Sequence, residues 1–138
     1  MQRASANFFA FIILLTGIHA IAAGNFGSSF GSPRLIPVEQ AFIVSRPSAD
    51  LVEIQIAEGT YIYDVHTKIQ TLEKEIIETS RSNAIRYNDP IFGMTLIYRN
   101  NMKLHMKNAS NTVVVFYQGC SDIGFCYPPK QSELSFSP

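Results

Sequence analysis

The stretch from Tyr117 to Pro129 contains both cysteines of the chain and constrains the fold more than any other part of the sequence. Five residues separate Cys120 from Cys126. The apolar run Val113 to Tyr117 leads towards Cys120 and predicts a strand that delivers this thiol to its end. Two prolines follow at 128 and 129, where a regular strand must stop because proline has no N–H for a sheet ladder. A short loop between two thiols fits either a structural disulfide or a redox switch.

The first residues have the pattern of an export signal. Arg3 precedes an apolar core from Phe8 to Ile18, and Ala20 to Ala22 fits a small-x-small cleavage site. The apolar core is shorter than the ~20 residues that cross a bilayer, so we expect cleavage rather than an uncleaved N-terminal anchor, which is the alternative. The expected organisation is a signal peptide over residues 1–23, a flexible glycine- and serine-rich lead-in over 24–34, and one domain over 35–138.

Charge and compartment narrow the function classes. The full chain has 11 basic and 11 acidic residues, and loss of Arg3 with the signal peptide leaves ten basic residues. This balance argues against nucleic-acid binding. Outside the cytosol a disulfide can form and persist. A closed loop of seven residues, however, stabilises a fold by only about 2–2.5 kcal/mol. This small contribution favours redox chemistry, and a purely structural disulfide remains the alternative.

Many short segments alternate between apolar and polar residues. Strands are predicted at Leu51–Ile56, Tyr61–Tyr63, Met94–Tyr98, Met102–Met106 and Val113–Gln118, with a turn at Arg46–Ser48 and a hairpin connection at Arg99–Asn101. The segment Thr67–Thr79 is ambiguous, because its isoleucines and leucine also fit a helical period. Short strands between regularly spaced turns predict an all-β sandwich.

Metal binding is disfavoured by spacing. Besides the two cysteines, only His66 and His105 remain in the expected domain, and no spacing groups them into a four-ligand zinc site. Met102, His105 and Met106 could suggest a copper site, because Cu(I) prefers soft ligands. On a strand the two methionines share one face and His105 the other, so core methionines are the preferred interpretation.

The segment Tyr117 to Pro129, with the sequence Tyr-Gln-Gly-Cys-Ser-Asp-Ile-Gly-Phe-Cys-Tyr-Pro-Pro, resembles the active-site motif of the N-terminal periplasmic domain of the thiol:disulfide interchange protein DsbD. Val38–Phe42, Gly59–Tyr63, and Phe92–Gly93 together with Ile97–Arg99 are also similar to that family. The resemblance covers about Leu35 to Leu134. It implies an immunoglobulin-like β-sandwich with a cap loop over a strand-end cysteine pair, and strand with loop rather than helix at Thr67–Thr79.

The resemblance also implies residue roles. Cys126 would form the mixed disulfide with a partner, and Cys120 would resolve it. A cap loop would fall on residues 88–93, with Asp89 at its start and either Ile91 or Phe92 shielding the thiols. The remaining expected site residues are Tyr61 and Tyr63 beside the thiols and Phe125 and Tyr127 as supporting or docking residues.

The function implied by the resemblance is a protein-disulfide reductase that works within a relay. Its acceptors would be periplasmic thioredoxin-like proteins of the disulfide-isomerase or cytochrome c maturation type. Its electrons would come from a membrane or thioredoxin-like donor, and it would act as a monomer without metal or other cofactor. The chain would be either a stand-alone module or a fragment of a longer protein. The competing functions are an immunoglobulin-like binding module with a structural disulfide, and a copper carrier.

Overall fold

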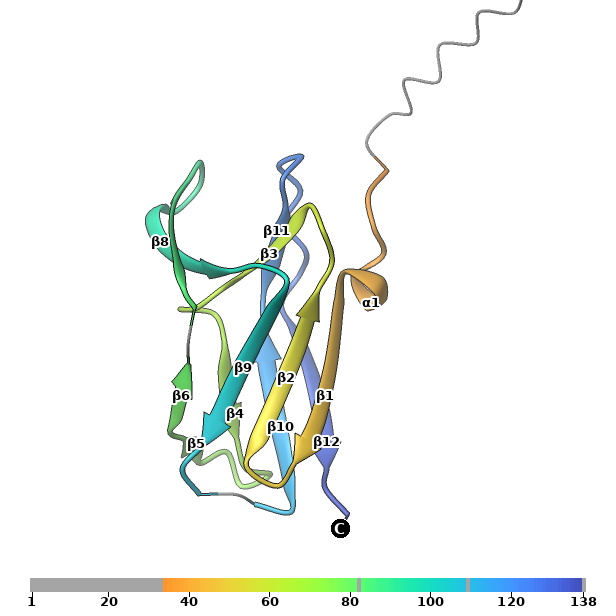
Figure 1. The fold of residues 1–138 in the computed structure, drawn as a ribbon, viewed down its shortest axis with the longest axis vertical. Coiled ribbons are helices and arrows are strands. Elements are labelled where there is room, and N and C mark those ends of the chain that lie inside the picture. Colours follow the sequence, from red (N-terminus) through yellow and green to blue (C-terminus); the bar gives the residue numbers. More distant parts are fainter. Residues whose placement is uncertain (1–33, 82, 109, 138) are drawn as a thin grey trace, which may run out of the picture. The chain divides into compact units, whose positions relative to one another are not determined.

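The computed structural model describes residues 34–81, 83–108 and 110–137. A single helical turn, α1 (Val38–Ala41), precedes strands that pair only in antiparallel fashion within this part of the chain. The strands form three sheets, each of four strands (Figure 1). The predicted signal peptide, and nearly all of the predicted lead-in, lie outside the described residues. No helix in the described segments is long and apolar enough to cross a membrane.

The first two sheets enclose the main core. The first has the order β1 (Phe42–Ser48), β2 (Leu51–Ile56), β9 (Asn101–Met106) and β6 (Thr79–Arg81). The second has the order β12 (Lys130–Ser135), β10 (Thr112–Tyr117), β4 (Lys68–Gln70) and β5 (Ile76–Ile77). Alternate residues of both sheets meet in one buried cluster, including Ile54 and Leu104 from the first sheet and Ile69, Val113 and Val115 from the second. The predicted all-β sandwich is confirmed.

The predicted strand alternation is confirmed where it was clearest. Val52 and Ile54 pair with Leu104 and Met102 across β2 and β9, and all four are fully buried. Met106 is buried on the same face, whereas His105 is exposed. The methionines are therefore core residues, as their position on a strand predicted.

The third sheet carries a separate small cluster. Its order is β11 (Gly119–Ser121), β3 (Thr60–Tyr63), β8 (Gly93–Tyr98) and β7 (Ile85–Asp89). Tyr61, Tyr63, Ile97 and Cys120 are packed together here. In Figure 1 β3, β8 and β11 lie at the end of the sandwich remote from β5 and β6. Cys120 therefore lies on β11 of this third sheet, which begins two residues after the end of β10, and Cys126 follows in the loop after β11.

Two expectations about turns and connections need correction. Arg46–Ser48 continues β1, and the turn falls on the next two residues instead. The expected hairpin between Met94–Tyr98 and Met102–Met106 is wrong, because β8 pairs with β3 and β7 whereas β9 pairs with β2 and β6. Asn100 has a φ of 65° where the chain passes from one sheet to the other.

The helical interpretation of Thr67–Thr79 is also wrong, and the strand assignment implied by the resemblance is correct. β4 and β5 pair there, with Ile69 opposite Ile77. Both of these isoleucines are buried, while Leu72 and Ile76 are 54% and 64% exposed. The apolar residues therefore do not share one buried helical face. Pairing of β4 with β10 fixes the segment as strand, which local periodicity cannot foresee.

Candidate functional site

The two cysteines form a disulfide with unequal exposure. Cys120 lies in β11 and is fully buried, whereas Cys126 lies in the following loop and is partly exposed. Their Cα atoms are 3.9 Å apart. Cys126 is therefore the cysteine that another molecule can approach. The order of attack that the resemblance implied, with Cys126 first, remains a prediction.

Backbone hydrogen bonds hold the cysteine loop in a tight turn. The Ser121 N–H donates to the Phe125 carbonyl at 2.7 Å, and the Gly124 N–H donates to the Ser121 carbonyl at 3.0 Å. Gly124 has a φ of +84°, which favours glycine. A Cβ atom at Gly119 would collide with the Tyr61 carbonyl oxygen, so a side chain there would push β11 away from β3.

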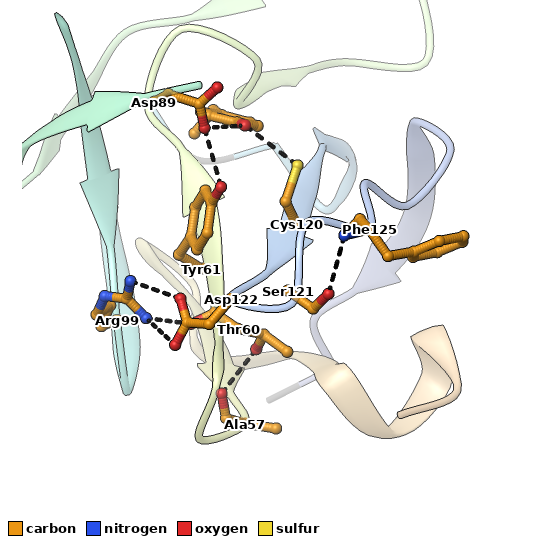
Figure 2. Close-up of polar contacts among 10 residues, drawn as sticks. Ala57, Thr60, Tyr61, Asp89, Arg99, Cys120, Ser121, Asp122 and Phe125 are labelled. Carbon is orange, nitrogen blue, oxygen red and sulfur yellow. Dashed lines mark hydrogen bonds and ion pairs between the residues drawn. The ribbon is translucent and has the colours of Figure 1, made fainter. Parts of the chain in front are cut away.

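Two tyrosines and one carboxylate lie directly beside the buried cysteine. The hydroxyls of Tyr61 and Tyr63 donate to Asp89 Oδ2 at 2.9 Å and 2.6 Å. Tyr63 Oη is also 3.1 Å from Cys120 Sγ. Figure 2 shows Asp89 and Tyr61 joined by such a bond near the Cys120 side chain. Because the Tyr63 hydroxyl donates its hydrogen bond to Asp89, the Tyr63 oxygen can accept a hydrogen bond from a reduced Cys120 thiol.

Burial and hydrogen bonding shift the acidities of this group. Burial, with the hydrogen bond to Asp89, raises the pKa of Tyr63 to about 12 and also raises the pKa of Tyr61. Burial opposes ionisation of Asp89. Donors from Tyr63, Tyr61 and two backbone N–H groups outweigh it, so the pKa of Asp89 lies below its ordinary value. The tyrosines stay protonated and Asp89 stays ionised at neutral pH.

Asp89 also orders the turn between β7 and β8, where the cap loop was expected. Its Oδ1 accepts hydrogen bonds from the N–H groups of Ile91 and Phe92 at 2.7 Å and 3.0 Å. The Phe92 ring lies 5.2 Å from the Tyr63 ring and 5.3 Å from the His66 ring, centroid to centroid. Ile91 is 66% exposed. Phe92 is itself 51% exposed, but of the two residues considered as a shield it is the one whose ring packs against Tyr63 and His66.

The two aromatic residues around Cys126 differ in accessibility. Phe125 is 43% exposed at the surface of the cysteine loop. Tyr127 is only 3% exposed, its ring packs 5.2 Å from that of Phe42, and its hydroxyl donates to the Ile36 carbonyl at 2.7 Å. Phe125 can contact a partner. Tyr127 belongs to the core, so its expected docking role does not fit and a supporting role does.

Sequence reasoning missed two residues beside the site. The Arg99 guanidinium forms an ion pair with Asp122 in the cysteine loop and lies 5.1 Å from the Tyr61 ring centroid. His66 packs edge-to-face on Tyr63 and on Phe92. A lone arginine and a lone histidine, each after a predicted strand, give no local signal of these contacts. The described residues contain no group of three or more histidine, cysteine or acidic side chains arranged to hold a metal.

The fold and site together define an immunoglobulin-like β-sandwich domain with a cysteine pair at one end of the sandwich. Residues 32–138 match the family described as thiol:disulfide interchange protein DsbD, N-terminal. The chain belongs to this family. The resemblance noted in the sequence and the predicted fold are both confirmed.

Relatives of known name agree with this assignment. The chain is 32% identical over 133 residues to the thiol:disulfide interchange protein DsbD of Escherichia coli O157:H7, and 31% identical over 133 residues to that of Escherichia coli strain K12. In each case the match covers 91% of this chain and 23% of the relative. The chain thus spans about a quarter of the length of these proteins.

Two solved structures from Neisseria meningitidis are similar in fold. The reduced DsbD N-terminal domain superposes with a TM-score of 0.65 and 28% identity, covering 75% of this chain and 90% of that one. A complex between the DsbD N-terminal and PilB N-terminal domains gives a TM-score of 0.62 and 26% identity, covering 75% and 89%.

Proposed function

We propose that this chain is an exported thiol–disulfide exchange domain that passes two electrons from its reduced cysteine pair to an oxidised partner protein. The observation that carries the proposal is the asymmetry of the pair. A partly exposed Cys126 is bonded to a fully buried Cys120 that touches Tyr63. Membership of the DsbD N-terminal family supports the same chemistry.

The reaction proceeds through a mixed disulfide. The Cys126 thiolate attacks one sulfur of the partner disulfide, which breaks that bond and leaves the other partner sulfur as a thiolate. The Cys120 thiolate then attacks Cys126 Sγ and releases the first partner sulfur. Both partner thiolates take up protons. The partner gains two electrons and two protons, and the Cys120–Cys126 disulfide forms. An upstream dithiol reverses the oxidation by the same exchange.

The surrounding residues have supporting roles in this proposal. The cap turn, defined here as Asp89 to Gly93, restricts access to the pair, with Phe92 as its packing residue and Ile91 exposed. Phe125 offers an apolar contact to the partner. Tyr61, Tyr63 and Tyr127 fix the local structure, and docking displaces the cap turn.

A solved complex of a relative supports our choice of partners. In Neisseria meningitidis a DsbD N-terminal domain forms a complex with the PilB N-terminal domain. For this chain we propose periplasmic thioredoxin-like acceptors of the disulfide-isomerase or cytochrome c maturation type, and a membrane or thioredoxin-like donor. A signal peptide over residues 1–23 would export a monomeric domain over 35–138, and the disulfide itself would be the only redox group.

Cysteine variants test the order of attack. The reduced Cys120→Ser variant should trap a mixed disulfide with an oxidised thioredoxin-like acceptor, because the resolving thiol is missing. The Cys126→Ser variant should trap none, and the double serine variant is the matched control. Adducts are counted by mass under non-reducing conditions. Equal trapping by the two single variants would contradict the assigned roles.

The burial of Cys120 also fits a second function, an immunoglobulin-like binding domain with a structural disulfide. The reduction potential separates the two. A value of roughly −180 to −270 mV, reached quickly in a thiol–disulfide buffer, is that of an exchange protein. A value below about −300 mV, or reduction only on unfolding, would establish the structural alternative.

A further inference from the structure

Arg99 contacts both Asp122 in the cysteine loop and the rings of Tyr61 and Tyr87. Its Nη2 and Nη1 atoms donate to the two carboxylate oxygens of Asp122 at 2.8 Å and 3.1 Å, a bidentate ion pair visible in Figure 2. Nη1 also lies 3.4 Å from the Thr60 carbonyl oxygen on β3. The guanidinium carbon lies 5.1 Å from the Tyr61 ring centroid and 5.8 Å from that of Tyr87, within cation–π range.

The cysteine loop does not need Arg99 in order to close. The backbone bonds between Ser121 and Phe125 and between Ser121 and Gly124 hold the loop itself. The Asp122 N–H donates to the Gly59 carbonyl at 2.8 Å, which fixes this residue to the turn before β3. The side chains of Arg99 and Asp122 are 30% and 46% exposed. An ion pair this exposed contributes little to folding. Because Asp122 lies in the loop that the Cys120–Cys126 disulfide closes, the charges of the pair can instead act on the acidity of the two thiols.

Two carboxylates belong to the surroundings of the cysteine pair, and Arg99 pairs with one of them, Asp122. Asp122 lies two residues after Cys120, and Asp89 accepts a hydrogen bond from the same Tyr63 hydroxyl that contacts Cys120 Sγ. A neighbouring carboxylate disfavours a thiolate, and a neighbouring cation favours it. The charged and titratable groups from the elements packed around the pair are Tyr61 and Tyr63 on β3, His66 after it, Tyr87 and Asp89 on β7, Arg99 after β8, and Asp122 in the loop.

We propose that Arg99 is a positioning residue of the exchange reaction, which neutralises Asp122 beside the cysteine pair and so allows the thiolate to form. Its contact with the Tyr61 ring holds the guanidinium at this place. The inference rests on the proposed exchange function and adds a residue to it. The attacking group remains the cysteine, and Arg99 acts through Asp122.

Two single variants should move thiol reactivity in opposite directions. We would measure the rate of the first alkylation of the reduced pair by iodoacetamide from roughly pH 5 to 10, where the thiolate is the reacting species. Arg99→Met removes the cation and should move the midpoint of this pH profile up by about half a pH unit or more. Asp122→Asn leaves the cation without its partner and should move the midpoint down.

The double variant and a lysine variant separate charge from structure. Arg99→Met combined with Asp122→Asn should return the midpoint close to that of the unaltered protein, because both charges are gone. Arg99→Lys should lie nearer to the unaltered protein than Arg99→Met. Shifts of both single variants in the same direction, no shift, or a double variant displaced further than either would overturn the proposal. Should Arg99→Met fail to fold, the downward shift of Asp122→Asn is still required.

This experiment fails independently of the exchange proposal. Alkylation requires no partner protein, so opposite shifts without mixed-disulfide trapping would uphold the effect of Arg99 on thiol acidity and reject the exchange function. Trapping without opposite shifts would reject the role of Arg99 alone.

Discussion

At the scale of single residues, Tyr63 contacts both the cysteine pair and the cap turn. Its hydroxyl is 3.1 Å from Cys120 Sγ and donates to Asp89, while its ring packs on Phe92. Asp89 in turn accepts four hydrogen bonds, two from tyrosines and two from the backbone of the cap turn. A single buried carboxylate therefore determines both the position of the tyrosines and the shape of the turn.

The pH dependence of stability should reveal this carboxylate. The pKa of Asp89 is lowered in the folded domain from an ordinary value near ~3.9, because hydrogen bonds to its ionised form outweigh burial. A lowered pKa adds stability that is fully present above the unfolded pKa and is lost as pH falls through the folded pKa. We expect the free energy of unfolding, measured in urea, to fall as pH decreases below about 4.

The matched variant is Asp89→Asn. At neutral pH it should lose about 1–3 kcal/mol of unfolding free energy, because an amide has one acceptor oxygen and either the two tyrosine hydroxyls or the two backbone N–H groups lose their acceptor. Its stability should then fall less steeply than that of the unaltered protein at acid pH. Parallel curves for the two proteins would show that Asp89 is not the group responsible.

At the scale of elements, the turn between β7 and β8 presents two apolar side chains with different surroundings. The Phe92 ring packs on those of Tyr63 and His66 although the residue is 51% exposed, and Ile91 is 66% exposed. Phe92→Ala should speed reduction of the disulfide by dithiothreitol on the order of several-fold, because access to the sulfur controls the exchange rate. Ile91→Ala is the control and should leave the rate unchanged. Equal acceleration by both variants would mean that the turn as a whole, and not the Phe92 ring, limits access.

The same scale shows how far the sequence allowed prediction. The strand at Leu51–Ile56 and the cysteine loop were predictable because their signals are local: alternation in one case, a long motif in the other. The structure of residues Thr67–Thr79 was not predictable from local pattern, because their apolar spacing fits both a helix and a strand. Pairing with β10 determines that the segment is strand. The bond between Tyr61 and Asp89 joins residues 28 positions apart, and a contact of this kind leaves no local pattern.

At the scale of the whole molecule, Arg46 joins the two main sheets at the end remote from the cysteines. Its guanidinium donates to the carbonyls of Ala49, Ser110 and Asn111 at 2.7, 2.5 and 2.8 Å, and lies 3.4 Å from that of Leu134 on β12. Partial burial lowers the pKa of this guanidinium, but it stays charged.

Arg46→Ala should therefore lower stability without changing the redox site. We expect a loss of about 2 kcal/mol in unfolding free energy, since several carbonyls lose a charged donor. The rate of disulfide reduction in the native state should be unchanged. A change in that rate would show that the far end of the sandwich is coupled to the cysteine loop.

The last prediction concerns the fold with and without its disulfide. The bridge closes a loop of seven residues, and on the chain-entropy model such a loop stabilises by about 2.4 kcal/mol. A domain of this size is stable by roughly 5–15 kcal/mol, and its main core of two facing sheets does not include the cysteines. The reduced domain should therefore remain folded, with an unfolding free energy lower by about 2 kcal/mol in urea. The Cys120→Ser, Cys126→Ser double variant should behave like the reduced form. Loss of cooperative unfolding on reduction would mean that the bridge holds the fold together, which is incompatible with the proposed exchange, because in that proposal the pair opens in every cycle.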